Sequence, residues 1–227
     1  MKLILFDIDG TIMDSGGAGT RSMDLAFKEV FSIDDAFRGI SMAGKTDLQI
    51  IKECLGKYGF PTDNGLVPQF VNAYVRYLGA EISNSNRHLK PGIREAIEHL
   101  NEMNEACRLG LLTGNIERGA RIKLGAFGLN DYFSFGAFGD DDEDRNKLLP
   151  VARERFEQRA GHPVDFKDCI IVGDTPRDVY CAKPYGAFCI AVATGPYSID
   201  ALLQAGADVV FETLSDTENF LKALKLD

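Results

Sequence analysis

Five short apolar runs, separated by segments with helical spacing, constrain the fold of this chain more than any other feature. The runs are KLILFD (2–7), ACRLGLL (106–112), DCIIVGD (168–174), AFCIAVA (187–193) and DVVF (208–211). Continuous apolar runs of this length are typical of strands that are covered on both faces. Amphipathic helical patterns lie between them, at 93–103, 115–128 and 147–159. This alternation predicts an α/β fold with a doubly wound parallel sheet, that is, a Rossmann-like core.

The stretch at 15–88 follows a different pattern and shows no buried strand. It contains three amphipathic helical segments, TRSMDLAFKEVF (20–31), DLQIIKECL (47–55) and VPQFVNAYVRYL (67–78), and two loop-like ones, PTDNG (61–65) and SNSNR (83–87). We therefore predict a helical cap domain at 15–88, inserted into a catalytic core made of 1–14 and 89–227. Hinges are expected near Ser15–Gly19 and His88–Pro91, because the SGGAG segment supplies conformational freedom.

The net charge of −9 over 227 residues disfavours nucleic acid and anionic membranes as partners. A phosphorylated ligand must then be bound locally, by a metal or a few positive groups. Five scattered cysteines without a CxxC pair indicate reduced thiols rather than a disulfide framework or a metal site. The chain shows neither a signal-peptide pattern nor an apolar run of membrane-spanning length, so we expect a cytoplasmic protein, monomeric or homodimeric.

Two aspartates, Asp7 and Asp9, follow the first apolar run and precede Gly10. Carboxylates at the tip of a buried strand are costly unless positive charge compensates them. The chain turns just past a strand end, so both side chains can point into one pocket. There, one carboxylate can act as a nucleophile and the other as an acid and base. The alternative interpretation is an Asx-type turn that only ends the strand.

A second acidic pair, Asp174 and Asp178, follows another buried run in CIIVGDTPRDV. Two aspartates four residues apart can reach one cation, and carboxylate oxygens suit a hard ion such as Mg²⁺. Such an ion would also compensate Asp7 and Asp9, so we predict a Mg²⁺ site formed by these four residues. The alternative is a helix start that is capped by Asp174 or Thr175.

The segment LGLLTGNIERG places Thr113, Gly114 and Asn115 between a predicted strand and a predicted helix. A hydroxyl and free backbone amides would then face the same edge of the sheet as Asp7 and Asp174. This arrangement suits a phosphate or carboxylate oxygen. Taken alone, the same residues could simply cap the helix.

Together, FDIDGT, LLTGN and IIVGDTPRDV resemble in order and spacing the motifs of the haloacid dehalogenase-like hydrolase superfamily, phosphatase branch. The resemblance spans the chain, and the helical insertion is similar to the small cap domain of that family. Because Asp14 and Ser15 follow the DGT motif, the chain most resembles phosphoglycolate-phosphatase-like members. The resemblance implies a phosphatase acting on a small phosphomonoester.

The same resemblance implies roles for individual residues. Asp7 would be the nucleophile that forms an aspartyl-phosphate, and Asp9 would protonate the leaving alcohol and then activate water. Mg²⁺ would be held by Asp7, the main-chain carbonyl of Asp9 and Asp174, with Asp178 supporting a bound water. Thr113 would bind the transferring phosphoryl group.

The sequence departs from the family pattern at the basic residue that should hold the nucleophile and the phosphate. The family carries a Lys, less often an Arg, before the helix that precedes the last acidic motif. Here the segment reads GDDDEDRNKLLP, without the common Lys-Pro pair. Arg145 is our choice for this role and Lys147 the alternative, and either could stabilise phosphoryl oxygens in the transition state.

Other members of the superfamily define the alternatives. True dehalogenases lack the second aspartate of the first motif, so Asp9 favours phosphoryl transfer. A sugar-phosphate mutase, a phosphonatase or a pyrophosphatase would carry the same motifs, because the cap determines specificity.

One segment favours a different class of protein. GISMAGKT at Gly39–Thr46 matches the P-loop pattern of nucleotide-binding proteins. A P-loop needs a buried strand directly before its first glycine, and SIDDAFR does not read as one. In the phosphatase interpretation this turn faces the active site, which makes Lys45 a candidate substrate-binding residue.

Overall fold

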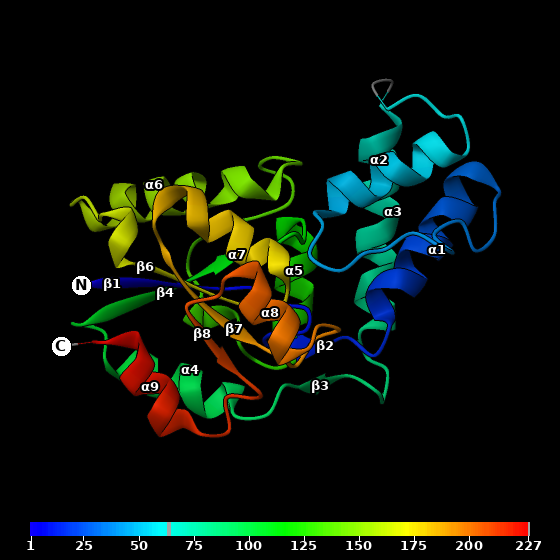
Figure 1. The fold of residues 1–227 in the computed structure, drawn as a ribbon. Coiled ribbons are helices and arrows are strands. Elements are labelled where there is room, and N and C mark those ends of the chain that lie inside the picture. Colours follow the sequence, from blue (N-terminus) through cyan, green and yellow to red (C-terminus); the bar gives the residue numbers. More distant parts are fainter. Residues whose placement is uncertain (63–64, 227) are drawn as a thin grey trace.

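The computed structural model describes residues 1–62 and 65–226 and contains a parallel sheet of six strands (Figure 1). The strands lie in the order β5-β4-β1-β6-β7-β8 and all pair in parallel. Their bounds are β1 Lys2–Phe6, β4 Cys107–Leu112, β5 Gly136–Ala137, β6 Cys169–Gly173, β7 Phe188–Val192 and β8 Val209–Phe211. All five apolar runs therefore form strands as predicted. The two-residue strand β5 was not predicted, because two residues show no pattern.

Helices cover both faces of this sheet, which confirms the predicted doubly wound α/β class. One face packs against α4 (Ile93–Glu102), α5 (Glu117–Gly125) and α9 (Thr217–Leu224), and the other against α6 (Leu148–Ala160) and α7 (Pro176–Ala182). Helix α8 (Ile199–Ala205) packs beside α7 and β8. Short 3₁₀ helices lie in the connections, at Asn130–Tyr132, Arg145–Lys147, Phe166–Asp168 and Lys183–Tyr185.

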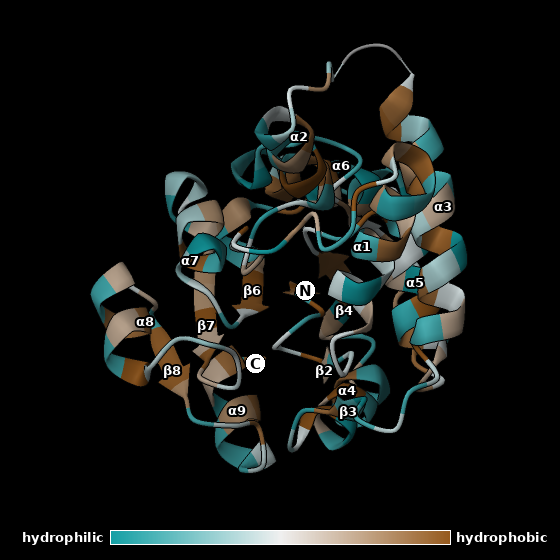
Figure 2. Ribbon diagram, turned by 90° about the vertical axis from the view of Figure 1, so that its right-hand side faces the viewer, coloured by the Kyte–Doolittle hydropathy of each residue, from teal (hydrophilic) through white to brown (hydrophobic). Residues whose placement is uncertain are grey.

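The strand at the centre of the sheet shows why the apolar runs are continuous. Leu3 and Leu5 of β1 join the core under α6 and α7, whereas Ile4 and Phe6 join the core on the opposite face. All four side chains are fully buried. Since successive side chains of a strand point to opposite faces, a strand covered on both sides must be apolar throughout. Figure 2 shows the resulting hydrophobic strands β6, β7 and β8.

The segment between the first strand and α4 forms three further helices, as predicted: α1 (Ala18–Phe31), α2 (Asp47–Lys57) and α3 (Leu66–Glu81). Figure 1 shows them grouped beyond the end of the sheet toward which β1 runs. The chain enters this helical segment through β2 (Met13–Asp14) and leaves it through β3 (His88–Leu89). These two short strands pair antiparallel.

These connections bear on the predicted domain bounds. Helix α1 begins at Ala18, so the predicted hinge at Ser15–Gly19 already contains the first two residues of a helix. The predicted loop PTDNG includes residues 63–64, which lie outside the described residues. The division into a cap at 15–88 and a core stays a prediction. Among the described residues, no helix is both long and apolar enough to cross a membrane.

Replacing a buried side chain of the central strands should destabilise the fold strongly. Leu111 in β4 is fully buried, so Leu111→Ala should lower the free energy of unfolding by about 2–5 kcal/mol. Leu203 in α8 is 51% exposed, so the matched change Leu203→Ala should alter it by less than about 0.5 kcal/mol. Urea unfolding of both variants tests this, and equal effects would contradict the assigned core.

Candidate active site

The carboxyl ends of three adjacent strands bring the predicted motifs together. Asp7 follows β1, Thr113 follows β4 and Asp174 follows β6, and these strands lie side by side in the sheet. Asp7 and Asp174 line a cavity of about 480 Å³, while Thr113 lies fully buried directly after β4. Ligands of open α/β sheets bind beyond the carboxyl ends of the strands, so this cavity is the candidate active site.

The carboxylate of Asp7 is held in place by the backbone amide of the next residue and by a cation. The amide of Ile8 donates to Asp7 Oδ1 at 2.7 Å, and Arg145 Nη2 lies 3.0 Å from Asp7 Oδ2. Burial raises the pKa of Asp7 to about 6, although the charge of Arg145 and the hydroxyl of Thr113 act in the opposite direction. At neutral pH the group is therefore mostly ionised.

Asp174 lies beside the turn that follows β1. Thr11 donates to Asp174 Oδ1 at 3.0 Å. Gly10 has a φ of +83°, and a Cβ atom there would lie 2.2 Å from Asp174 Oδ2, so only glycine fits this turn. Burial, together with the charges of Asp178 and Asp7, raises the pKa of Asp174 well above its usual value.

Arg145 links two of the buried carboxylates. Its Nη2 pairs with Asp7 and also donates to Asp178. Asp178 in turn accepts from the amide and hydroxyl of Thr175 at 3.0 and 2.8 Å, at the start of α7. The helix-cap alternative therefore holds for Thr175, and it also explains part of the role of Asp178. Burial lowers the pKa of Arg145, but the charges of Asp178 and Asp7 outweigh this and raise it.

Three of the four predicted metal ligands lie close enough together to share one ion. Oxygens of Asp7, Asp174 and Asp178 all lie within 4.8 Å of one another. The three side chains are buried, and Arg145 supplies one positive charge against their three negative charges. A divalent cation would balance the remaining two charges, and an all-oxygen donor set suits a hard ion. The residues present therefore fit a divalent metal.

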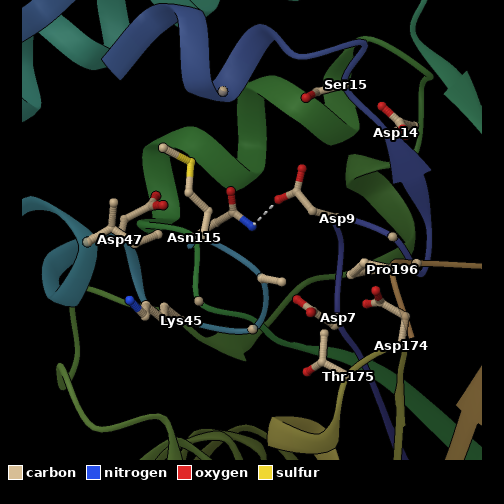
Figure 3. Close-up of a pocket in the computed structure, with 18 of the residues that line it drawn as sticks. Asp7, Asp9, Asp14, Ser15, Lys45, Asp47, Asn115, Asp174, Thr175 and Pro196 are labelled. Carbon is tan, nitrogen blue, oxygen red and sulfur yellow. Dashed lines mark hydrogen bonds between the residues drawn. The ribbon is translucent and has the colours of Figure 1, made fainter. Parts of the chain in front are cut away.

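Asp9, the fourth predicted ligand, directs its carboxylate elsewhere. Asp9 Oδ2 accepts from Asn115 Nδ2 at 2.8 Å and from Lys123 Nζ at 2.6 Å. Lys123 also donates to Asn115 Oδ1 at 2.6 Å. Figure 3 shows the Asp9 carboxylate pointing toward Asn115 and away from Asp174. The Asp9 side chain is 44% exposed, so the two aspartates of the first motif occupy different environments.

The start of α2 closes one side of the cavity against the loop after β4. The amide of Asp47 donates to the carbonyl oxygen of Gly114 at 2.7 Å, and Asp47 Oδ2 accepts from the amide of Ile116 at 2.9 Å. A Cβ atom on Gly114 would lie 2.1 Å from the carbonyl oxygen of Lys45, so the contact requires glycine. Lys45 lines the cavity, and its ammonium group pairs with Glu53.

The structure separates the two candidates for the basic residue. Arg145 is 5% exposed and lies against Asp7. Lys147 has a side chain that is 62% exposed, pairs with Asp142 at 3.1 Å and does not line the cavity. The 3₁₀ helix at Arg145–Lys147 points these two residues in different directions, which their sequence spacing alone does not reveal.

Comparisons with known proteins agree with this geometry. The family model of the haloacid dehalogenase-like hydrolases matches residues 1–186. The chain belongs to this family. The predicted resemblance is thereby confirmed, and the chain is a phosphatase of the haloacid dehalogenase-like family.

Curated relatives carry the name phosphoglycolate phosphatase. The relative from Vibrio vulnificus is 24% identical, over 95% of this chain and 93% of its own length. The relative from Pseudomonas syringae pv. syringae is 28% identical, over 86% of this chain and 70% of its own length. These relatives confirm the predicted similarity to phosphoglycolate-phosphatase-like members of the family.

Solved structures show the same fold. A "predicted phosphatase from Clostridium acetobutylicum" superimposes with a TM-score of 0.72, at 20% identity and 98% coverage of both chains. The structure of CbbY from Rhodobacter sphaeroides in complex with phosphate superimposes with a TM-score of 0.73, at 18% identity and with 95% and 96% coverage. The P-loop alternative, by contrast, lacks its strand, since residues 32–46 contain none.

Three polar residues of this haloacid dehalogenase-like site were missed by the sequence analysis. Helical spacing in the sequence could have indicated Lys123, because it lies with Gly119, Ala120 and Leu124 on the buried face of α5. Asp47 and Thr11 had no such signal beyond their proximity to segments already noted, since their roles arise from contacts with loops distant in the sequence.

Removing the cation at the centre of the carboxylates should destabilise the protein. Arg145→Met leaves Asp7 and Asp178 buried without compensation, so the free energy of unfolding at pH 7 should fall by about 3–5 kcal/mol. The matched change Lys147→Met affects an exposed side chain and should cost less than about 0.5 kcal/mol. Urea unfolding in metal-free buffer distinguishes them, and a larger effect at Lys147 would reverse the assignment.

The buried Asp47 should make stability depend on pH. Burial raises the pKa of Asp47 from its ordinary value of 3.8 to about 6. Between these two pH values the folded protein holds a proton that the unfolded chain has already released. The stability from this proton is fully present below about pH 4 and is lost as the pH rises through 6. Asp47→Asn stays neutral and keeps an oxygen for the Ile116 amide.

The free energy of unfolding of Asp47→Asn, relative to the unsubstituted protein, should thus rise by up to about 3 kcal/mol between pH 4 and pH 7. Urea unfolding of the metal-free proteins at several pH values measures this difference. Asp34→Asn, at an exposed aspartate, is the control and should show no such trend. A flat difference for Asp47→Asn would contradict the raised pKa.

Proposed function

We propose that this phosphatase is a Mg²⁺-dependent phosphomonoester hydrolase that works through an aspartyl-phosphate on Asp7. The observation that supports this most directly is the cluster of buried carboxylates beyond the ends of β1 and β6, formed by Asp7, Asp174 and Asp178, with Arg145 beside Asp7. Asp7 Oδ would attack phosphorus, the bond to the alcohol oxygen would break, and water would later hydrolyse the acyl phosphate. Bound Mg²⁺ would supply positive charge for the phosphoryl oxygens and for the surrounding carboxylates.

In this proposal Asp9 is the acid and base. It would give its proton to the leaving alcohol oxygen and then take a proton from the water that attacks the aspartyl-phosphate. Its partial exposure and its hydrogen bonds to Asn115 and Lys123 keep its carboxylate apart from the metal cluster, on the side where the leaving group would lie. Asp9 would bind metal only through its main-chain carbonyl.

The remaining predicted residues would bind the phosphate and position the reacting groups. Thr113 and the backbone around Gly114 would face the phosphoryl oxygens, as the buried hydroxyl beside Asp7 suggests. Arg145 would hold Asp7 in line and stabilise the developing charge on the phosphoryl group. Asp174 would be a direct metal ligand, with Asp178 supporting it.

Helices α1–α3 would act as a cap that selects the substrate. They bring Lys45 and Asp47 to the cavity, and Asp47 is hydrogen-bonded to the loop after β4. A cavity of about 480 Å³ suits a small phosphorylated metabolite. The names of the curated relatives make 2-phosphoglycolate the first compound to test.

Phosphate release from small phosphomonoesters, with Mg²⁺ and with EDTA, tests this function. Release should require Mg²⁺, and Asp7→Asn should reduce kcat by about 10³-fold or more because the amide is not a nucleophile. Asp131→Asn, at an exposed aspartate outside the cavity, should release phosphate at the rate of the unsubstituted protein.

A readout that does not depend on turnover accompanies this assay. Mg²⁺ should raise the melting temperature of metal-stripped protein, since an ion that binds only the folded state stabilises it. Retention of more than a tenth of the activity in Asp7→Asn would contradict the nucleophile. A melting temperature insensitive to Mg²⁺ would contradict the metal site.

A further inference from the structure

The cavity contains a buried hydroxyl that the proposed phosphate chemistry does not use. Tyr74 of α3 lines the cavity and is fully buried. Among the described residues, its hydroxyl oxygen has no hydrogen-bond partner. Buried hydroxyls are nearly always paired, because an unpaired one costs free energy. This exception, at the wall of a cavity, therefore suggests a ligand.

Two charged groups accompany Tyr74. Its ring packs near Gly119 of α5, where a Cβ atom would lie 3.6 Å from Tyr74 Cε1, and Lys123 lies one turn further along this helix. Asp47 also lines the cavity, and its charge helps raise the pKa of the Tyr74 hydroxyl, although burial contributes most. Helix α5 of the core and helices α2 and α3 of the predicted cap therefore each contribute a residue to this part of the cavity wall.

Both charged groups retain hydrogen-bonding capacity. Lys123 has three N–H donors, of which two are directed at Asp9 and Asn115. Asp47 Oδ2 accepts from the amide of Ile116, and within the described residues Asp47 Oδ1 has no partner. The cavity wall therefore offers a hydroxyl, an ammonium donor and a carboxylate acceptor together.

We propose that Asp47, Tyr74 and Lys123 form a subsite that binds a hydroxyl group of the substrate's alcohol part, which makes a phosphorylated polyol or sugar the substrate class. This inference rests on the proposed phosphomonoesterase function. A substrate hydroxyl both donates and accepts. It can donate to Asp47 Oδ1 and accept from Tyr74 or Lys123, and thus satisfy the unpaired groups.

A substrate carboxylate fits the same subsite poorly. A carboxylate only accepts hydrogen bonds, so it leaves Asp47 Oδ1 without a donor. It would also lie near the negative charge of Asp47, and like charges close together in a buried site repel strongly. The subsite therefore disfavours an acid such as 2-phosphoglycolate relative to a polyol phosphate.

The test compares two substrates with the same carbon chain, D-erythritol 4-phosphate and n-butyl phosphate, which differ in their hydroxyl groups. The quantity of interest is the ratio of their kcat/KM values in the presence of Mg²⁺. Tyr74→Phe removes only the unpaired hydroxyl, and it should lower this ratio about ten-fold or more. Tyr77→Phe is the matched control on the same helix, because its hydroxyl bonds to Glu29 on the outer surface, and it should leave the ratio unchanged.

Each outcome has a distinct meaning. A lowered ratio in Tyr74→Phe alone, with 2-phosphoglycolate a poorer substrate than erythritol phosphate, supports the subsite. An unchanged ratio in Tyr74→Phe, or a preference for 2-phosphoglycolate, overturns it while leaving the phosphatase function intact. Absence of phosphate release from all these compounds and from p-nitrophenyl phosphate would contradict the proposed function itself.

Discussion

The site depends on the pairing of Arg145 with two buried carboxylates, Asp7 after β1 and Asp178 in the first turn of α7. Without this cation, three aspartates would meet in a region that excludes water, where ionised groups are unstable. One positive charge does not neutralise three negative ones, and the raised pKa values of Asp7 and Asp174 reflect this imbalance as well as burial. The fold thus holds an excess of negative charge that a divalent metal would balance.

The contact between α2 and the loop after β4 determines the shape of the cavity. It depends on Gly114, where a side chain would collide with the backbone of Lys45, and on the two hydrogen bonds of Asp47. Because the same loop carries Thr113 and Asn115, the predicted cap is joined directly to residues near Asp7, the proposed nucleophile. In the proposed function, recognition of the alcohol and binding of the phosphate would thereby be coupled through one short loop.

The sequence predicted the sheet and the acidic motifs because strands covered on both faces must be apolar and because their carboxyl ends converge. It did not distinguish Arg145 from Lys147, since the choice depends on how a single 3₁₀ turn is oriented. It also missed Asp47 as a site residue, because its partners lie in a loop distant in the sequence. Helical periodicity could have revealed Lys123, as a cation on the buried face of α5, and Tyr74, as a polar aromatic on the buried face of α3.

The two aspartates of the first motif illustrate how one turn can serve two functions. Asp7 lies in the buried cluster and faces Arg145, whereas Asp9 is partly exposed and faces Lys123. Each carboxylate therefore has its own cation, supplied by a different element of the core. Lys123, the cation that orients the proposed acid and base, also lines the cavity and belongs to the proposed subsite for a substrate hydroxyl. Selection of the substrate and protonation of the leaving group would thereby share one residue, Lys123, because it holds Asp9 and forms part of the proposed subsite.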